Sequence, residues 1–81
     1  MSAIWYEIWV AEILDERWSQ WFEGMEILPR FENGSRTGTI LLGSLPDQAA
    51  LFGILSQVRN LNLTLIECRR IGEPYTTNGE N

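Results

Sequence analysis

The stretch IWYEIWVAEI, residues 4–13, constrains the fold most, because it is apolar on both of its alternating faces. Trp, Tyr, Ile and Val dominate it, and these residue types favour a pleated strand. Alternation predicts one wholly apolar face, made of Ile4, Tyr6, Ile8 and Val10. The other face is half apolar and carries Trp5, Glu7, Trp9, Ala11 and Ile13. This pattern is typical of a strand in the middle of a sheet that is covered on both sides.

The next segments predict a short helix and a hairpin. Residues 15–23 predict a helix that Asp15 caps, with Trp18, Trp21 and Phe22 at the spacing of a core-facing stripe. Residues 25–32 predict an edge strand, because its proline cannot donate to a ladder. The Asn-Gly pair at 33–34 predicts a tight turn into a return strand at 36–43. Within that strand Gly38 indicates a bulge or a close backbone approach.

A second helix and a last strand complete the chain. Residues 45–48 open the helix, with Pro46 at its first helical position. An apolar stripe at helical spacing follows, made of Ala50, Leu51, Ile54, Leu55, Val58 and Leu61. Asn60 and Asn62 are both able to end this helix, since Asn tolerates the left-handed conformation. Residues 63–71 predict the last strand.

The order strand, helix, strand, strand, helix, strand predicts an α+β fold. We expect a ferredoxin-like βαββαβ sandwich, with a four-stranded antiparallel sheet in the order 4-1-3-2 and two helices on one face. A chain of 81 residues has room for one core. We therefore expect a single domain over residues 1–72 and a polar C-terminal tail over residues 73–81.

Several motifs resemble those of a set of small, uncharacterised bacterial proteins. They are Tyr6-Glu7-Ile8, the run from Leu14 to Trp18, the run from Trp21 to Gly24, and Asp47-Gln48-Ala49-Ala50-Leu51. Together they follow the pattern YEIxVxGxLDxRWxxWFxG…DQAALxGxL, and the resemblance extends from Tyr6 to Arg70. It implies a compact, ferredoxin-like sandwich, and it implies no activity and no functional residues.

Composition argues against most catalytic chemistries. The chain has a net charge of −5, six Arg, no Lys and no His. It therefore offers no His nucleophile partner, no His metal ligand and no Schiff-base lysine. A negative domain does not attract nucleic acid or an anionic membrane. We interpret the cluster of Glu12, Asp15 and Glu16 as a helix cap, and Cys68, the sole cysteine, as a buried inert thiol. We expect a cytoplasmic protein without cofactor or metal, since we find neither a signal peptide nor a membrane span.

The half-apolar face of the first strand is the best candidate for a binding surface. Two helices on one side of the sheet leave the other side open, and the wholly apolar face of the first strand fits the helix side. Trp5, Glu7 and Trp9 would then stand on the open side, and apolar patches of this kind mark association. We expect a non-enzymatic interaction module that self-associates there, as a dimer by default. In the competing interpretation the tail around Tyr75 covers the same surface.

An alternative of a different class is a small-molecule binding protein or a minimal enzyme. It would use an aromatic pocket for an anionic or aromatic ligand, with Arg36 or Arg69 holding the anionic group. The residues proposed to line this pocket are Tyr6, Trp9, Trp18, Trp21, Arg36 and Arg69.

Overall fold

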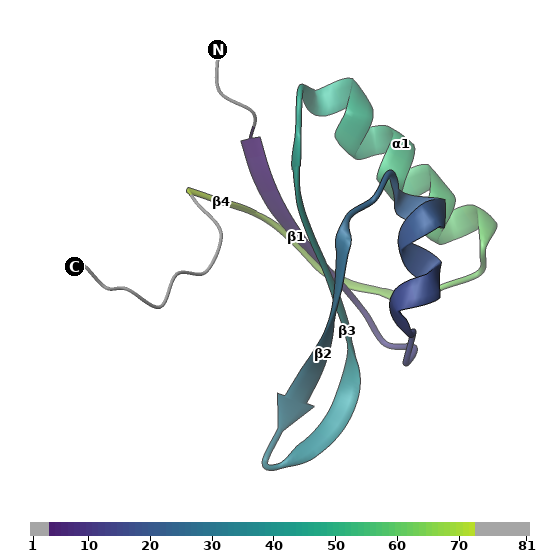
Figure 1. Ribbon diagram of the computed structural model, residues 1–81, viewed down its shortest axis with the longest axis vertical. Helices are drawn as coiled ribbons and strands as arrows, with labels where there is room; N and C mark the ends of the chain where they lie inside the picture. Colours follow the sequence, from purple (N-terminus) through teal and green to yellow (C-terminus); the bar gives the residue numbers. More distant parts are fainter. Residues whose placement is uncertain (1–3, 73–81) are drawn as a thin grey trace.

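The computed structural model describes residues 4–72, which form one sheet with two helices beside it (Figure 1). In chain order the elements are β1 (Ile4–Val10), the 3-10 helix η1 (Glu16–Phe22), β2 (Glu26–Glu32), β3 (Ser35–Leu45), α1 (Gln48–Asn60) and β4 (Leu65–Ile71). The predicted α+β fold, with a four-stranded antiparallel sheet and two helices, is confirmed, and the first helix is a 3-10 helix. The predicted tail, including Tyr75, lies outside the described residues.

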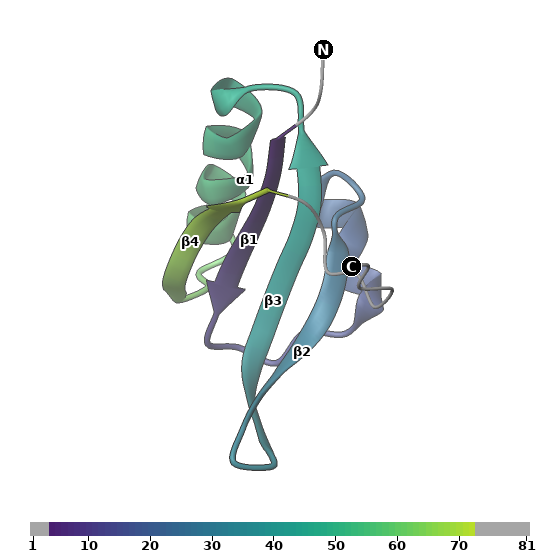
Figure 2. The same ribbon diagram turned by 90° about the vertical axis from the view of Figure 1, so that its left-hand side faces the viewer.

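The four strands form one antiparallel sheet in the order β2-β3-β1-β4. Read from the other edge, this is the predicted neighbour order 4-1-3-2. In the middle of the sheet Ile8 lies opposite Leu41 on one side and Cys68 on the other. β2 is an edge strand, as Pro29 predicts. Both helices lie on one face of the sheet, and Figure 2 looks onto the other face.

The first strand is shorter than the sequence predicts. β1 ends at Val10, where its pairing with β4 shifts register. One last backbone hydrogen bond, from the Ala11 amide to the Thr64 carbonyl at 3.0 Å, follows before the chain turns toward η1. Ile13 therefore lies outside the sheet and is exposed. Its placement on a sheet face was wrong, because alternation along the chain does not reveal where a partner strand stops pairing.

The first helix is a 3-10 helix, and this changes which aromatic side chains are buried. Asp15 caps it as predicted, accepting a hydrogen bond from the Arg17 amide at 3.0 Å. Phe22 is fully buried, whereas Trp21 is 50% exposed, so the prediction that both face the core was wrong for Trp21. A 3-10 helix turns about 120° per residue, and positions i+3 and i+4 then diverge instead of sharing a stripe.

The second helix follows its apolar stripe. Asp47 is the N-cap and accepts a hydrogen bond from the Ala50 amide at 2.9 Å. Pro46 therefore precedes the cap, and the helix begins two residues later than expected. Leu51, Ile54 and Val58 are buried against the sheet. After the last turn Asn62 adopts a φ of 61°, the left-handed conformation that Asn tolerates.

Two local signals in the hairpin are confirmed. Asn33 and Gly34 have φ angles of 52° and 82°, as a turn with two left-handed central residues requires. At Gly38 the β3 backbone approaches the end of β1 closely, and a Cβ atom there would lie 2.5 Å from the carbonyl oxygen of Val10. Any side chain at this position would force the strands and the following loop apart.

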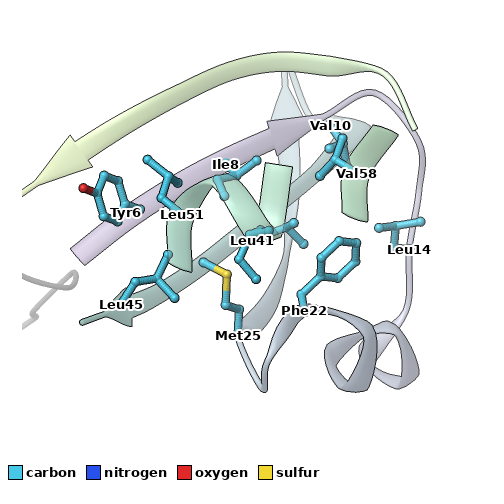
Figure 3. Close-up of a cluster of buried hydrophobic side chains, with 11 residues drawn as sticks. Tyr6, Ile8, Val10, Leu14, Phe22, Met25, Leu41, Leu45, Leu51 and Val58 are labelled. Atoms are coloured by element: carbon cyan, nitrogen blue, oxygen red, sulfur yellow. The ribbon is translucent and has the colours of Figure 1, made fainter. Parts of the chain in front are cut away.

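The core lies between the helix-side face of the sheet and the two helices (Figure 3). The predicted core face of β1 is confirmed, with Tyr6, Ile8 and Val10 buried and Ile4 partly buried. Leu51 of α1 lies near Tyr6 at one end of the core and Val58 near Val10 at the other, and Met25 lies beside Leu41 between Leu45 and Phe22 (Figure 3). The members of the cluster are Tyr6, Ile8, Val10, Leu14, Phe22, Met25, Leu41, Leu45, Leu51, Ile54 and Val58.

One exposed carboxylate links the loop after β1 to the start of β4. Glu12 accepts hydrogen bonds from the amide and the hydroxyl of Thr64, at 2.8 and 2.9 Å. The backbone hydrogen bond from Thr64 is the main cause that lowers the pKa of this carboxyl below its usual range. A lowered folded-state pKa contributes stability above the unfolded pKa and loses it as the pH falls.

We therefore expect Glu12→Gln to be destabilising at neutral pH, and the difference from the unchanged chain to shrink as Glu12 protonates in acid. The effect should be well below ~1 kcal/mol, because the group is exposed to solvent. Urea unfolding at a series of pH values measures it. Glu16→Gln, in the first turn of η1, is the charge-matched control. An equal pH dependence in both variants would contradict the role of Glu12.

Candidate functional site: the open sheet face

The side of the sheet that carries no helix is here called the open face. Trp5, Glu7 and Trp9 all belong to it, because Tyr6, Ile8 and Val10 of the same strand are buried on the helix side. The pairing registers place on the same face the residues opposite these three, namely Ser44, Leu42 and Ile40 on β3 and Ile71, Arg69 and Glu67 on β4. β2 adds Leu28 opposite Ile40 and Arg30 opposite Gly38. The structure thus brings together the three residues predicted for an interface.

Trp9 is the centre of this surface. The guanidinium carbon of Arg30 lies 4.7 Å from the centroid of its ring, and that of Arg69 lies 4.9 Å from it. Arg30 reaches the ring from the β2 side of the sheet and Arg69 from the β4 side. Cation–π contacts of this kind contribute about 0.5–1 kcal/mol each where they are solvent-accessible. Trp9 is therefore held in place by two charged side chains and is partly buried.

Glu7 is a buried carboxylate on a face that no helix covers. It is only 3% exposed. The indole nitrogen Nε1 of Trp9 donates a hydrogen bond to its Oε1 at 3.0 Å, and Nε of Arg69 lies 3.7 Å from the same oxygen. Burying a carboxylate is costly unless hydrogen bonds and a cation compensate for the lost water. Trp9 and Arg69 supply that compensation, so groups of the folded sheet hold the carboxylate of Glu7 in place.

Both arginines of the open face are paired with carboxylates. Arg69 is bonded to Glu67 through Nη2 at 2.6 Å, and Arg30 to Glu32 through Nη2 at 2.8 Å. The open face thus carries an apolar centre with charges of both signs around it. The expectation of two exposed Trp side chains was wrong in this respect, since Trp5 and Trp9 are both partly buried. Long charged side chains cover apolar surface with their stems.

The residues predicted for an aromatic pocket are not brought together. Tyr6 is buried in the core, and Trp18 packs against the core from η1. Arg69 lies on the open face, on the other side of the sheet, because it is paired with Glu7. Nη2 of Arg36 donates to the Leu14 carbonyl and to the Thr39 hydroxyl, at 3.0 Å each. Arg36 thus holds the chain rather than facing a pocket.

A different hollow lies on the helix side and was not predicted. It is a groove of about 600 Å³ between the end of η1 and residues 50–57 of α1. Trp21, the one residue of the predicted pocket that lines it, stands on the η1 side beside Glu23, while Ala50, Gly53 and Gln57 line the α1 side. A Cβ atom added at Gly53 would meet no atom within 4 Å, so the glycine leaves this wall of the groove open, and no sequence signal indicated the groove.

Thr39 has a structural role that the sequence did not indicate. It is fully buried, and its hydroxyl donates to the Glu12 carbonyl at 2.8 Å. The same oxygen accepts from the Leu14 amide at 2.9 Å and from Arg36. One hydroxyl therefore ties the loop between β1 and η1 to β3. Threonine is common in strands for other reasons, so the residue type alone carries no signal of this role.

The thiol of Cys68 and the carboxylate of Asp15 lie in environments that serve the fold. Cys68 is partly buried against the core, and desolvation raises the pKa of its thiol, which disfavours the reactive thiolate. Asp15 caps η1 and forms an ion pair with Arg17 at 2.8 Å. Within residues 4–72 there is no group of three His, Cys, Asp or Glu side chains able to hold a metal ion. In the same part of the chain no helix has the length and apolar character needed to span a membrane.

Comparison with known proteins identifies one family. A family model described as a domain of unknown function (DUF8691) matches residues 5–69. No curated protein and no solved structure matches the chain.

Proposed function

The chain belongs to the family described as a domain of unknown function (DUF8691), and we propose that it is a non-enzymatic protein-interaction module that self-associates through the open face. The observation that carries this proposal is the composition of that face. It combines two Trp side chains of the central strand with charges of both signs, and no element within residues 4–72 covers it. A bacterial origin and a cytoplasmic location stay predictions.

The charges on the open face favour a second copy as the partner. Arg30 and Arg69 lie on the same surface as Glu7, Glu67 and the Arg30-bound Glu32. In a dimer with two-fold symmetry one patch meets the same patch of the other copy. A surface with charges of both signs is able to place arginines of each copy near carboxylates of the other, whereas a patch of a single sign would repel itself.

The small size of the chain favours the same conclusion. Domains of this length bury a limited fraction of their surface, and association is a common way to add apolar contact. A fully covered Trp side chain buries 150–250 Å², which corresponds to several kcal/mol for two Trp residues before the entropy of association is subtracted. Trp5 and Trp9 are only partly buried within one chain, so part of that area is available to a partner.

We also propose the ferredoxin-like plan as the closest description of the fold. The neighbour order β2-β3-β1-β4 and the placement of both helices on one face support it. The departure from the plan is η1, which is a seven-residue 3-10 helix where that plan has an α-helix.

A second candidate function is the binding of a small molecule in the groove beside Trp21. The groove has an indole ring on one wall and a carboxylate, that of Glu23, nearby. This lining favours an aromatic or cationic ligand over the anionic ligand that arginines would hold. Quenching of Trp21 fluorescence by aromatic compounds, absent in Trp21→Gln, would support it.

The open face is tested best at Trp5. Trp9 donates to the buried Glu7, so replacing Trp9 also disturbs the fold. Trp5 lies at the rim of the open face, where it borders a small hollow with Glu26 and Ser44. We expect Trp5→Gln to weaken self-association at least tenfold, which corresponds to about 1.4 kcal/mol. Light scattering coupled to size exclusion, over a range of protein concentrations, measures the change.

Trp21→Gln is the matched control, since it removes a part-exposed Trp from the helix side. It should leave the association unchanged. A full-length protein that stays monomeric at high micromolar concentration would overturn the proposal, and so would equal association of the two variants.

A further inference from the structure

The two edges of the sheet differ in their ability to accept another strand. The β2 edge carries Pro29 and a register shift between Arg30 and Phe31 in its pairing with β3. Both features discourage the addition of a strand. The β4 edge has seven residues without a proline, and its outer side pairs with no other strand within residues 4–72. Its pairing with β1 also shifts register, beyond Glu67 toward Leu65, but from Glu67 to Ile71 the pairing is regular. An edge of this kind is a template for another strand.

The sequence of β4, Leu-Ile-Glu-Cys-Arg-Arg-Ile, is complementary to itself when it is read antiparallel about Cys68. In that register Glu67 lies opposite the partner's Arg69, and Arg69 lies opposite the partner's Glu67. Acid then meets base on both sides of Cys68, within the regular part of the strand. Opposite pairs of this kind stabilise an antiparallel ladder.

Other registers are less favourable. A slip of one residue would turn the open face of one copy against the helix side of the other, because side chains alternate along a strand. A slip of two residues in either direction keeps the faces aligned. It places Glu67 opposite the partner's Glu67, or Arg69 opposite the partner's Arg69, and like charges directly opposite are destabilising. The register about Cys68 and its two-residue slips all keep the open faces of both copies on one side. Of these three, only the register about Cys68 places opposite charges across from each other.

Exposed apolar side chains gather on the same side of the molecule. Leu65 and Ile66, at the start of β4, are 46% and 48% exposed. Phe52 of α1 is 58% exposed. At about 100° per residue it lies on the flank of α1 opposite Ala50 and Gln57, which face the groove toward η1. That flank is on the β4 side of the molecule, since η1 lies behind β2 and α1 behind β4 and β1 (Figure 2).

From these observations we infer that β4 pairs with β4 of a second copy, antiparallel and centred on Cys68, so that two sheets join into one. The two-fold axis is perpendicular to the sheet and keeps both open faces on one side. Phe52 then faces the helices of the partner across the contact between the two β4 strands. This contact is distinct from the association through the open face and does not depend on it.

The test uses the thiol of Cys68, which is the only cysteine of the chain, so any cross-link between thiols joins two chains at this position. In the proposed register the two Cys68 side chains are directly opposite, with Cβ atoms about 4.5–5.5 Å apart. A short bismaleimide should therefore convert the full-length protein into a covalent dimer. The control is Cys68→Ser/Ser35→Cys, which moves the thiol to the exposed hairpin, and it should give at least tenfold less product.

A charge variant tests the register. Glu67→Arg places arginines opposite each other twice in the dimer. We expect the dissociation constant to rise, and the yield of cross-linked dimer to fall, by roughly tenfold. Glu32→Arg is the matched control, because Glu32 pairs with Arg30 on β2 just as Glu67 pairs with Arg69 on β4. It should cross-link as the unchanged chain does.

Two outcomes would overturn the pairing: a yield at Cys68 no greater than at the hairpin, or a yield that Glu67→Arg leaves unchanged. Trp5→Gln should not alter the cross-link at all. Failure of the edge contact and failure of the open-face contact are therefore distinguishable.

Discussion

Replacing Phe22 by alanine is expected to cost about 3–5 kcal/mol of the free energy of unfolding, the largest effect of any single change proposed for this protein. Phe22 is fully buried at the end of η1 and belongs to the core cluster with Leu14, Met25 and Leu41. Its ring is the buried anchor of a short 3-10 helix that has little stability of its own. Small domains are stable by about 5–15 kcal/mol, so the variant should lie near the threshold of unfolding.

The adjacent Trp21→Ala is the control for this change. Trp21 is the larger side chain, but it is half exposed, and its removal should cost much less. Urea unfolding followed by circular dichroism gives both values. If Trp21→Ala costs as much as Phe22→Ala, the assignment of η1 as a 3-10 helix with one buried anchor is wrong.

Thr39→Val should cost about 2–4 kcal/mol although it preserves the shape of the side chain. The change removes the donor to the part-buried Glu12 carbonyl and the acceptor for the buried Leu14 amide, and both groups then lack their partner. It also removes one of the groups that hold Arg36. An unsatisfied buried polar group costs about 1–3 kcal/mol, and several are created at once.

Thr39→Ser keeps the hydroxyl and loses only a methyl group, so it should cost clearly less than Thr39→Val. Urea unfolding measures both variants, and hydrogen exchange of the Leu14 amide reports on the hydrogen bond itself. Faster exchange at Leu14 is expected for Thr39→Val and not for Thr39→Ser. A cost of Thr39→Ser as large as that of Thr39→Val, or equal exchange of the Leu14 amide in the two variants, would contradict the role of the hydroxyl.

Much of the fold was predictable because its signals are local. Alternation along residues 4–10 identifies the core face of β1, and Asp47 and the apolar stripe after it identify α1. The Asn33-Gly34 turn defines the hairpin, and Pro29 assigns β2 to an edge. Each signal depends on the conformational preferences of a few adjacent residues, so it can be identified from the sequence without knowing the tertiary contacts.

The candidate site was predictable only in part. The placement of Trp5, Glu7 and Trp9 on one face follows from alternation alone. Their surroundings do not, because Arg30 reaches Trp9 from another strand and covers it. The proposed pocket failed for a related reason. Arg69 and Tyr6 lie on opposite sides of the sheet, and the register between β1 and β4 decides which β4 side chains share a face with Tyr6.

By itself the sequence determined the periodicities of the elements, the caps and turns, and the absence of His and Lys chemistry, because these depend on residue type and spacing. Only the tertiary structure decided that Glu7 is buried under Trp9 and Arg69, and that Thr39 ties a distant loop to the sheet. It also decided that β4 has an unpaired edge. These features depend on groups far apart in the chain that meet once the strands are in register, and no local preference encodes that meeting.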